Sequence, residues 1–219
     1  MTYQELLIQH PRLTRSLKKF ILDQDSALEL SQFEKFIDSL HEALHEARAE
    51  LQKADPGIPR ARKLHEMVDQ EISQAHHLPA SCQKGCSACC HIEVEITTYE
   101  AEILADLIKN GFVVDQTQWI AQNERIVGDP IWKKASHEPL NKCLFLSQLG
   151  ECSIYNDRPV MCRRHSVTSP AQLCKTLEAP ISVRYFPRVD LLISAANEDE
   201  GLAIGPLAKM LMRKICFKT

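Results

Sequence analysis

The chain has 219 residues, of which 44% are hydrophobic and 25% are charged, an ordinary composition for a globular protein. Its net charge of -3 gives no electrostatic reason to expect a nucleic-acid partner. No apolar run is long enough to span a bilayer, and residues 1–5 lack the features of a secretory signal, so we expect no membrane partner. The expected compartment is a reducing cytoplasm, where nine cysteines need an explanation other than disulfides.

Residues 1–78 are expected to form an N-terminal helical extension. Helices are predicted over residues 3–22, with a break at Pro11, over 33–51 and over 60–77. The middle helix has the clearest apolar stripe, which joins Phe33, Phe36, Ile37, Leu40, Leu44, Ala47 and Leu51. We expect these helices to pack their stripes together as a hairpin or bundle.

Residues 79–180 are expected to form a small metal-centred domain of short elements. Residues 92–96 alternate in polarity like a half-buried strand. Thr97 and Glu100 have the spacing of a capping box, which predicts a helix that ends at Gly111.

A short β-hairpin is predicted over residues 143–155, with its turn at Gly150. The two sides of this hairpin would bring Cys143 and Cys152 near each other. A helix is predicted to begin just before Cys162, where the helix dipole and the adjacent arginine would favour the thiolate form of that cysteine.

The last segment, residues 181–219, is predicted to contain helices over residues 188–197 and 205–216 that pack on the rest of the chain. Cys216 follows an apolar helix face and is expected to be a core residue. The sequence therefore predicts a mostly α or α+β protein, with a helical hairpin or bundle beside the metal-centred domain.

Eight of the cysteines are clustered in the middle of the chain and are the expected metal ligands. They are Cys82, Cys86, Cys89, Cys90, Cys143, Cys152, Cys162 and Cys174. The spacing of Cys86 and Cys89 lets two thiolates chelate one metal from a tight turn, which Gly85 eases. Thiolates select zinc, iron–sulfur clusters or Cu(I) over cations that prefer oxygen.

The adjacent pair Cys89 and Cys90 is unusual for a zinc knuckle. Neighbouring side chains are expected to diverge, so the two thiols should not both join one mononuclear tetrahedron. This pair favours a cluster or a paired site over a lone knuckle, and leaves open which of the two is a ligand. Residues 158–188 are rich in arginine and lysine, which either offsets the charge of a thiolate site or forms an ordinary solvated surface.

Three segments, Cys82–Cys90, Cys143–Leu146 and Gly150–Ser166, resemble the YkgJ-like family, which is described as a zinc- or iron-chelating domain with a CxxCxxCC signature. The resemblance covers about residues 80–175 and implies bound zinc or iron. The chain departs from the signature by one extra residue between Cys82 and Cys86. Flagellin lysine methylase is similar in its cysteine motif, which implies an iron–sulfur cluster and methyl transfer as an alternative. The chain has no glycine-rich fingerprint that supports methyl transfer independently.

Two further motifs suggest other chemistry. His41-Glu42-Ala-Leu-His45 matches the HExxH pattern of metalloproteases, but the predicted helix places Glu42 opposite its apolar stripe, so a solvated helix face is expected. Cys86 and Cys89 could also act in thiol–disulfide exchange, although no strand precedes them.

Four histidines lie near the cysteines, and Arg158 lies at the predicted corner between the hairpin and the following helix. The histidines His76, His77, His91 and His165 could each replace a thiolate, but are expected to be surface residues or neighbours of the ligands. Arg158 is expected to brace the corner or to hydrogen-bond sulfur.

Two function classes remain. The first is a binding module in which zinc or iron orders the domain, and the second is an iron–sulfur enzyme or electron-transfer protein.

Overall fold

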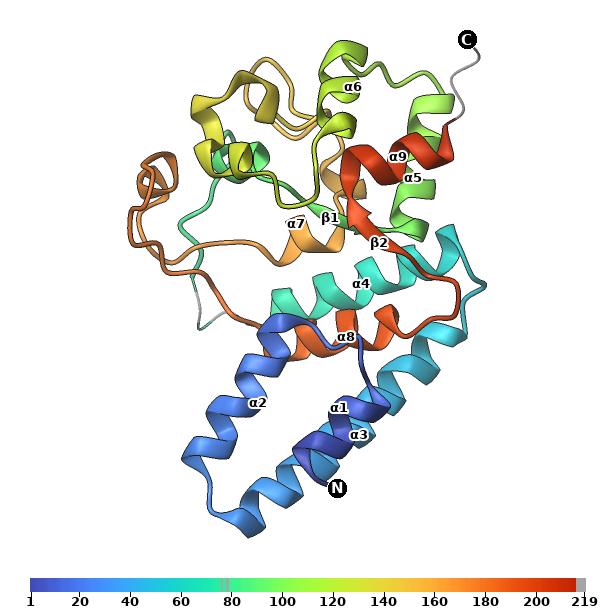
Figure 1. The fold of residues 1–219 in the computed structure, drawn as a ribbon, viewed down its shortest axis with the longest axis vertical. Coiled ribbons are helices and arrows are strands. Elements are labelled where there is room, and N and C mark those ends of the chain that lie inside the picture. Colours follow the sequence, from blue (N-terminus) through green and yellow to red (C-terminus); the bar gives the residue numbers. More distant parts are fainter. Residues whose placement is uncertain (76, 78, 216–219) are drawn as a thin grey trace. The chain divides into compact units, whose positions relative to one another are not determined.

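The computed structural model describes residues 1–75, 77 and 79–215, apart from the side chains of residues 134–137. The chain forms two units. Unit 1 comprises Met1–Gln74 and Tyr185–Leu202, and unit 2 comprises Ala75–Arg184 and the chain after Leu202. The described part is mostly helical with one small antiparallel sheet, which confirms the predicted fold class (Figure 1). Among the described residues, no helix combines the length and apolar character required to cross a bilayer.

Unit 1 consists of helices. They are α1 (Tyr3–Gln9), α2 (Arg15–Ala27), α3 (Leu30–Gln52), α4 (Ile58–Gln74) and α8 (Pro187–Asn197). The predicted stripe of α3 is buried from Phe33 to Leu51, although Phe36 is only half-buried. Helix α8 packs against α2, α3 and α4, and it is buried on most of its surface, as expected for a helix with apolar residues on every side.

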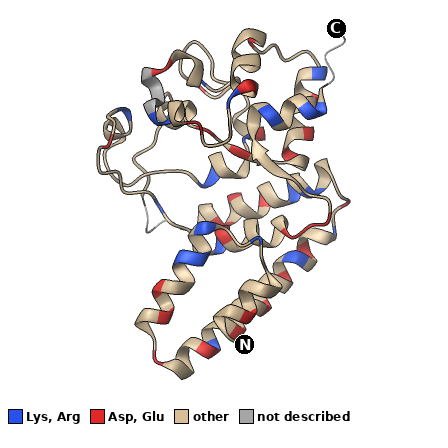
Figure 2. Cartoon of the chain, in the orientation of Figure 1, with Lys and Arg blue, Asp and Glu red and all other residues tan. Residues whose placement is uncertain are grey.

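Polar side chains connect the start of α2 to α8 within unit 1. Thr14 caps α2 by accepting a hydrogen bond from the Leu17 N–H, and its hydroxyl donates to Asp190 Oδ1 over 2.8 Å. The Ser194 hydroxyl accepts from the Thr14 N–H over 3.0 Å. Acidic and basic residues both occur along α2, α3 and α4, and the acids of α3 recur every four residues from Glu34 to Glu50 (Figure 2).

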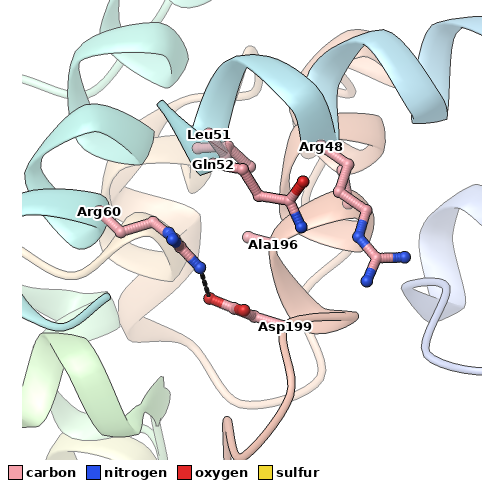
Figure 3. A pocket seen from close by; sticks show the side chains of 7 residues that line it. Arg48, Leu51, Gln52, Arg60, Ala196 and Asp199 are labelled. Atoms are coloured by element: carbon pink, nitrogen blue, oxygen red, sulfur yellow. Dashed lines mark hydrogen bonds and ion pairs between the residues drawn. The ribbon is translucent and has the colours of Figure 1, made fainter. Parts of the chain in front are cut away.

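A small pocket in unit 1 is lined by residues of α3, α4 and the end of α8, among them Arg48 and Gln52 (Figure 3). Arg60 Nη1 lies 2.5 Å from Asp199 Oδ2 at this pocket, and Arg60 also donates to the Ala54 carbonyl. The polar groups of Arg60 and Asp199 are therefore occupied in holding the end of α8 to the start of α4.

Unit 2 is built from short elements. They are η1 (Ala88–His91), β1 (Glu95–Thr97), α5 (Thr98–Lys109), α6 (Gln116–Glu124), η2 (Pro130–His137), η3 (Pro139–Asn141), η4 (Tyr155–Asp157), α7 (Val160–Arg164), η5 (Ala171–Lys175), β2 (Ile204–Pro206) and α9 (Leu207–Lys214), where η denotes a 3₁₀ helix. Strands β1 and β2 are antiparallel, with Ile96 opposite Gly205. Helices α5 and α6 pack on α9, and the Trp119 indole N–H donates to the Ala208 carbonyl over 2.9 Å.

The capping box at Thr97 and Glu100 is confirmed, and α5 stops before Gly111, whose φ of 102° suits glycine. The strand predicted over residues 92–96 is shorter and lies further along the chain, because β1 spans only Glu95–Thr97. The helix predicted over 205–216 begins only at Leu207, because Pro206 provides its N-cap and the preceding residues pair with β1.

Candidate metal centre

All eight predicted ligand cysteines lie in unit 2, and all are free thiols. Cys82 is exposed and the other seven are half-buried. They come from five places, which are the loop before η1 (Cys82, Cys86), η1 itself (Cys89, Cys90), the two sides of the hairpin (Cys143, Cys152), α7 (Cys162) and η5 (Cys174).

The loop before η1 makes a tight turn at its second cysteine. The Cys86 N–H donates to the Gln83 carbonyl over 2.9 Å, and Gly85 between them has a φ of 83°, which a residue with a side chain rarely adopts. The Cys90 N–H then donates to the Ser87 carbonyl over 2.9 Å as η1 begins. Backbone hydrogen bonds therefore shape this segment where it has little apolar side-chain area.

The expected hairpin is present as one antiparallel bridge, and its first residue and its turn lie against the first cysteine segment. The Cys143 N–H donates to the Cys90 carbonyl over 2.7 Å, and Leu146 and Cys152 form an antiparallel bridge. At the turn, a Cβ added to Gly150 would lie 3.5 Å from Ser87 Oγ. The hairpin thus brings the second cysteine group to the first.

Buried Glu100 positions the helix that carries Cys162. One carboxylate oxygen of Glu100 accepts from the Thr97 N–H over 2.9 Å, as the capping box requires. The other oxygen accepts from the N–H of Val160, the first residue of α7, over 2.7 Å. Glu100, which is 1% exposed, therefore accepts backbone hydrogen bonds at the starts of both α5 and α7.

We expect Glu100→Ala to lower the free energy of unfolding by about 2–4 kcal/mol, because it removes a helix cap and leaves buried N–H donors without an acceptor. Asp106→Ala, on the exposed face of the same helix, is the control and should change stability by less than about 0.5 kcal/mol. Denaturant unfolding measures both values. Equal effects of the two substitutions would contradict the role of Glu100.

Burial and neighbouring thiols hold two of the cysteines in their protonated form when no metal is bound. Burial raises the pKa of Cys143 to about 11, and the nearby thiols of Cys152 and Cys89 add to the rise, against a backbone hydrogen bond from Phe145. Burial likewise raises the pKa of Cys162, and so do its neighbours, Cys143 first among them.

The expectation that Cys162 favours its thiolate is therefore wrong for the metal-free protein. Helix α7 is only five residues long, and burial outweighs its dipole. The adjacent Arg163 is engaged elsewhere, since its guanidinium donates to the carbonyls of Arg158 and Asn156.

The adjacent thiols of Cys89 and Cys90 interact electrostatically. Cys90 is the main cause of a raised pKa at Cys89, followed by burial. Arg158 lowers the same pKa, so its charge reaches this thiol. Arg158 also donates to the Tyr155 carbonyl over 3.0 Å and stacks on the Tyr155 ring, which confirms that it braces the corner before α7.

The electrostatic interactions divide the thiols into two groups. Cys162 is influenced by Cys143, Cys89 and Cys152, and we call these four the inner group. The pKa of Cys174 is raised by burial and then by Cys86, Cys82 and Cys89, and we call Cys82, Cys86 and Cys174 the outer group. In the outer group, the Cys82 sulfur also accepts from the Val167 N–H over 3.4 Å. Cys89 interacts with both groups, and Cys90 adjoins it.

The donor set fits zinc, iron or an iron–sulfur cluster, because it consists of soft sulfur atoms with a basic residue nearby. Among the residues that the structure describes, no three of these sulfurs lie within 4.8 Å of one another. Thiolates on one zinc ion lie about 3.8 Å apart, from Zn–S bonds of about 2.3 Å in a tetrahedron. Metal binding would therefore draw the cysteine side chains together.

The histidines near the cysteines show no ligand arrangement in the described structure. His77 is exposed, His91 Nδ1 lies 3.0 Å from the Ser87 carbonyl, and the pKa of His165 is lowered by burial and then by Arg164. His76 and Cys216 lie outside the described residues.

A different histidine cluster, in unit 1, was missed by sequence reasoning. Glu42 and His45 are exposed as expected, but His41 is half-buried and contacts His10. His10 is 31 residues away from His41, and no spacing pattern connects them.

Residues 81–177 match the model of the family CxxCxxCC, described as "Putative zinc- or iron-chelating domain". The matched segment includes all eight clustered cysteines and none of unit 1. No curated protein and no solved structure matches the chain.

Proposed function

We propose that residues 81–177, which match the model of the zinc- or iron-chelating CxxCxxCC family, hold zinc, iron or an iron–sulfur cluster through cysteine thiolates. One observation carries this proposal, namely that eight free thiols from five separate places in the chain are gathered in one unit. Metal–thiolate bonds are a strong source of folding energy, and the loop before η1 has few apolar contacts of its own. The metal would order this loop.

We propose all eight clustered cysteines as ligands. The inner group provides four thiols, and Cys90 with the outer group provides four more. Eight thiols exceed the four that one tetrahedral ion accepts. The electrostatic interaction between Cys89 and Cys90 supports a cluster or two adjoining sites over a lone knuckle.

An iron–sulfur enzyme or electron-transfer protein is the second candidate, and the number of thiols favours it. Thiol–disulfide exchange by Cys86 and Cys89 is less well supported. A reactive cysteine of this kind has a lowered pKa, whereas the pKa of Cys89 is raised. All of these functions need reduced thiols, which agrees with the proposed cytoplasmic location.

Metal analysis of the full chain, purified without oxygen, tests the proposal. We expect at least one zinc or iron per chain. A colourless protein with zinc supports the binding module, and a brown protein with iron and acid-labile sulfide supports a cluster. Freshly purified protein with all eight thiols reduced but with neither zinc nor iron would refute metal binding.

A further inference from the structure

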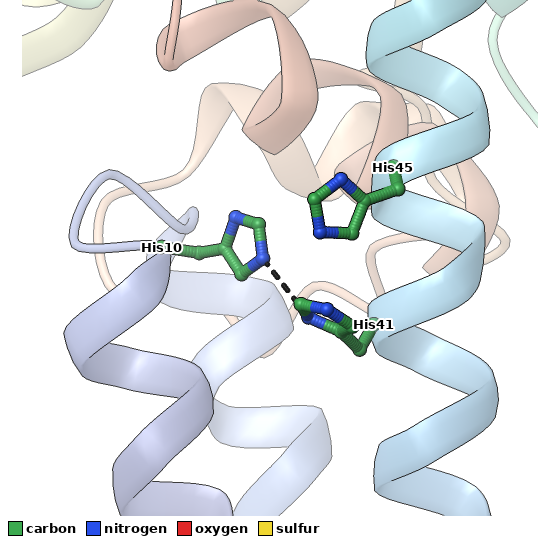
Figure 4. Close-up of side chains that lie close together, drawn as sticks. All are labelled: His10, His41 and His45. Carbon is green, nitrogen blue, oxygen red and sulfur yellow. Dashed lines mark hydrogen bonds between the residues drawn. The ribbon is translucent and has the colours of Figure 1, made fainter. Parts of the chain in front are cut away.

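Three histidines in unit 1 point into one shared space, outside the segment that matches the family. His41 and His45 are four residues apart on α3, so they lie on the same side of that helix. His10 approaches them from the C-cap of α1 (Figure 4). The ligand nitrogens of the three rings all lie within 4.8 Å of one another. Elsewhere in the part of the chain that the structure describes, no group of three histidine, cysteine or carboxylate side chains is this close.

The three rings are held by different parts of the fold. The ring centroids of His41 and His45 are 4.3 Å apart. The ring centroid of His10 lies 5.3 Å from that of His41 and 5.7 Å from that of His45. The His10 N–H donates to the Leu6 carbonyl over 2.9 Å at the end of α1, and Leu6 is fully buried. His10 is therefore fixed by α1, while the other two rings are fixed by the middle of α3.

A buried carboxylate faces the far side of the His10 ring. Glu198 Oε2 lies 2.9 Å from His10 Nδ1, and the two side chains are 8% and 6% exposed. This contact has the distance of an ion pair without hydrogen-bond geometry, and neither His10 Nδ1 nor Glu198 Oε1 has a hydrogen-bond partner among the described residues. The guanidinium of Arg48 is 3.6 Å from the same carboxylate oxygen.

A carboxylate close to one ring nitrogen is common around metal-binding histidines. A carboxylate beside one ring nitrogen fixes a proton there, and the other nitrogen then presents its lone pair to a metal. In His10 that other nitrogen is Nε2, which lies 3.3 Å from His41 Nδ1. A cation at this place would replace the hydrogen bond between these two ring nitrogens and would give the buried pair of His10 and Glu198 a defined proton position.

We propose that His10, His41 and His45 bind a divalent transition-metal cation such as Zn²⁺, with Glu198 as the positioning residue of His10. Three neutral imidazoles suit zinc, nickel and copper, and they leave a coordination position open. The site is not that of an HExxH protease, because Glu42 is exposed. The cation would fasten α1 to α3 within unit 1. The proposal is independent of the cysteines, since all four residues belong to unit 1.

Zinc titration of the full chain with its resident metal in place tests this site. Isothermal calorimetry should show one additional zinc equivalent for the wild type. His45→Gln should weaken this binding by at least about 100-fold, because it removes one ligand, and Glu198→Gln should weaken it by about 10–100-fold. His45 is exposed, so its substitution should leave folding unchanged, which circular dichroism verifies.

His77→Gln is the matched control, since His77 is an exposed histidine outside the cluster. It should retain the additional equivalent with unchanged affinity. Side-chain NMR should also show the ring resonances of His10, His41 and His45 shifting together as zinc is added. The proposal is overturned if the wild type binds no additional zinc, or if His45→Gln and His77→Gln bind it equally well.

Discussion

Cys143→Ser should remove most of the bound metal from the freshly purified protein and lower its melting temperature by at least about 10 °C. Cys143 interacts electrostatically with the other three inner-group thiols, and its backbone N–H joins the hairpin to η1. A structural metal site contributes about 10–16 kcal/mol of apparent binding free energy, so the loss of one ligand should cost at least about 3 kcal/mol. In a unit of this size, each kcal/mol corresponds to several degrees.

Cys216→Ser is the matched control, because it removes one thiol outside the segment that matches the family. Its metal content should equal that of the wild type. Metal analysis and thermal unfolding, both without oxygen, measure the two variants. Equal metal content in Cys143→Ser and Cys216→Ser would show that Cys143 is not a ligand.

Much of the fold could be predicted because long helices leave strong local signals. The stripe of α3 and the capping box of α5 each depend on residues within a few turns of one another. Strand β2 could not be predicted in the same way. It has three residues, and its position depends on pairing with β1 more than a hundred residues earlier.

The candidate metal centre was visible in the sequence because the spacing of its cysteines is local. The electrostatic influence of the thiols on one another could not be read from the sequence. Whether Cys162 is a thiolate depends on burial, which outweighs the short helix that the sequence revealed. Glu100 was recognised as a helix cap, but its bond to Val160 spans 60 residues and has no sequence signal. The contact of His10 with His41 was missed because the two residues are 31 positions apart and no sequence pattern connects them.

A strong chelator added to the reduced full chain should destabilise unit 2 far more than unit 1. Unit 2 contains the cysteines and is made of short elements, whereas the long helices of unit 1 bury continuous apolar stripes. Hydrogen exchange should show the largest loss of protection at the backbone N–H groups of Cys86, Cys90 and Cys143, whose hydrogen bonds shape the cysteine segments. Helix α3 away from its histidines should keep its protection.

The effect of pH on chelation has a defined direction. Since burial raises the pKa of Cys143 to about 11, this thiol is protonated in the metal-free protein at neutral pH, and metal binding must release its proton. Protons therefore compete with the metal, so the chelator should extract it more readily at pH 6 than at pH 8. The Asp106→Ala variant, which keeps all eight thiols, should show the same dependence as the wild type.

The hydrogen-exchange experiment has one outcome that would contradict ordering by the metal. Unchanged exchange protection at Cys86, Cys90 and Cys143 after complete metal removal would mean that the hydrogen bonds of the polypeptide alone hold the cysteine segments, and that the metal is carried by a domain already folded.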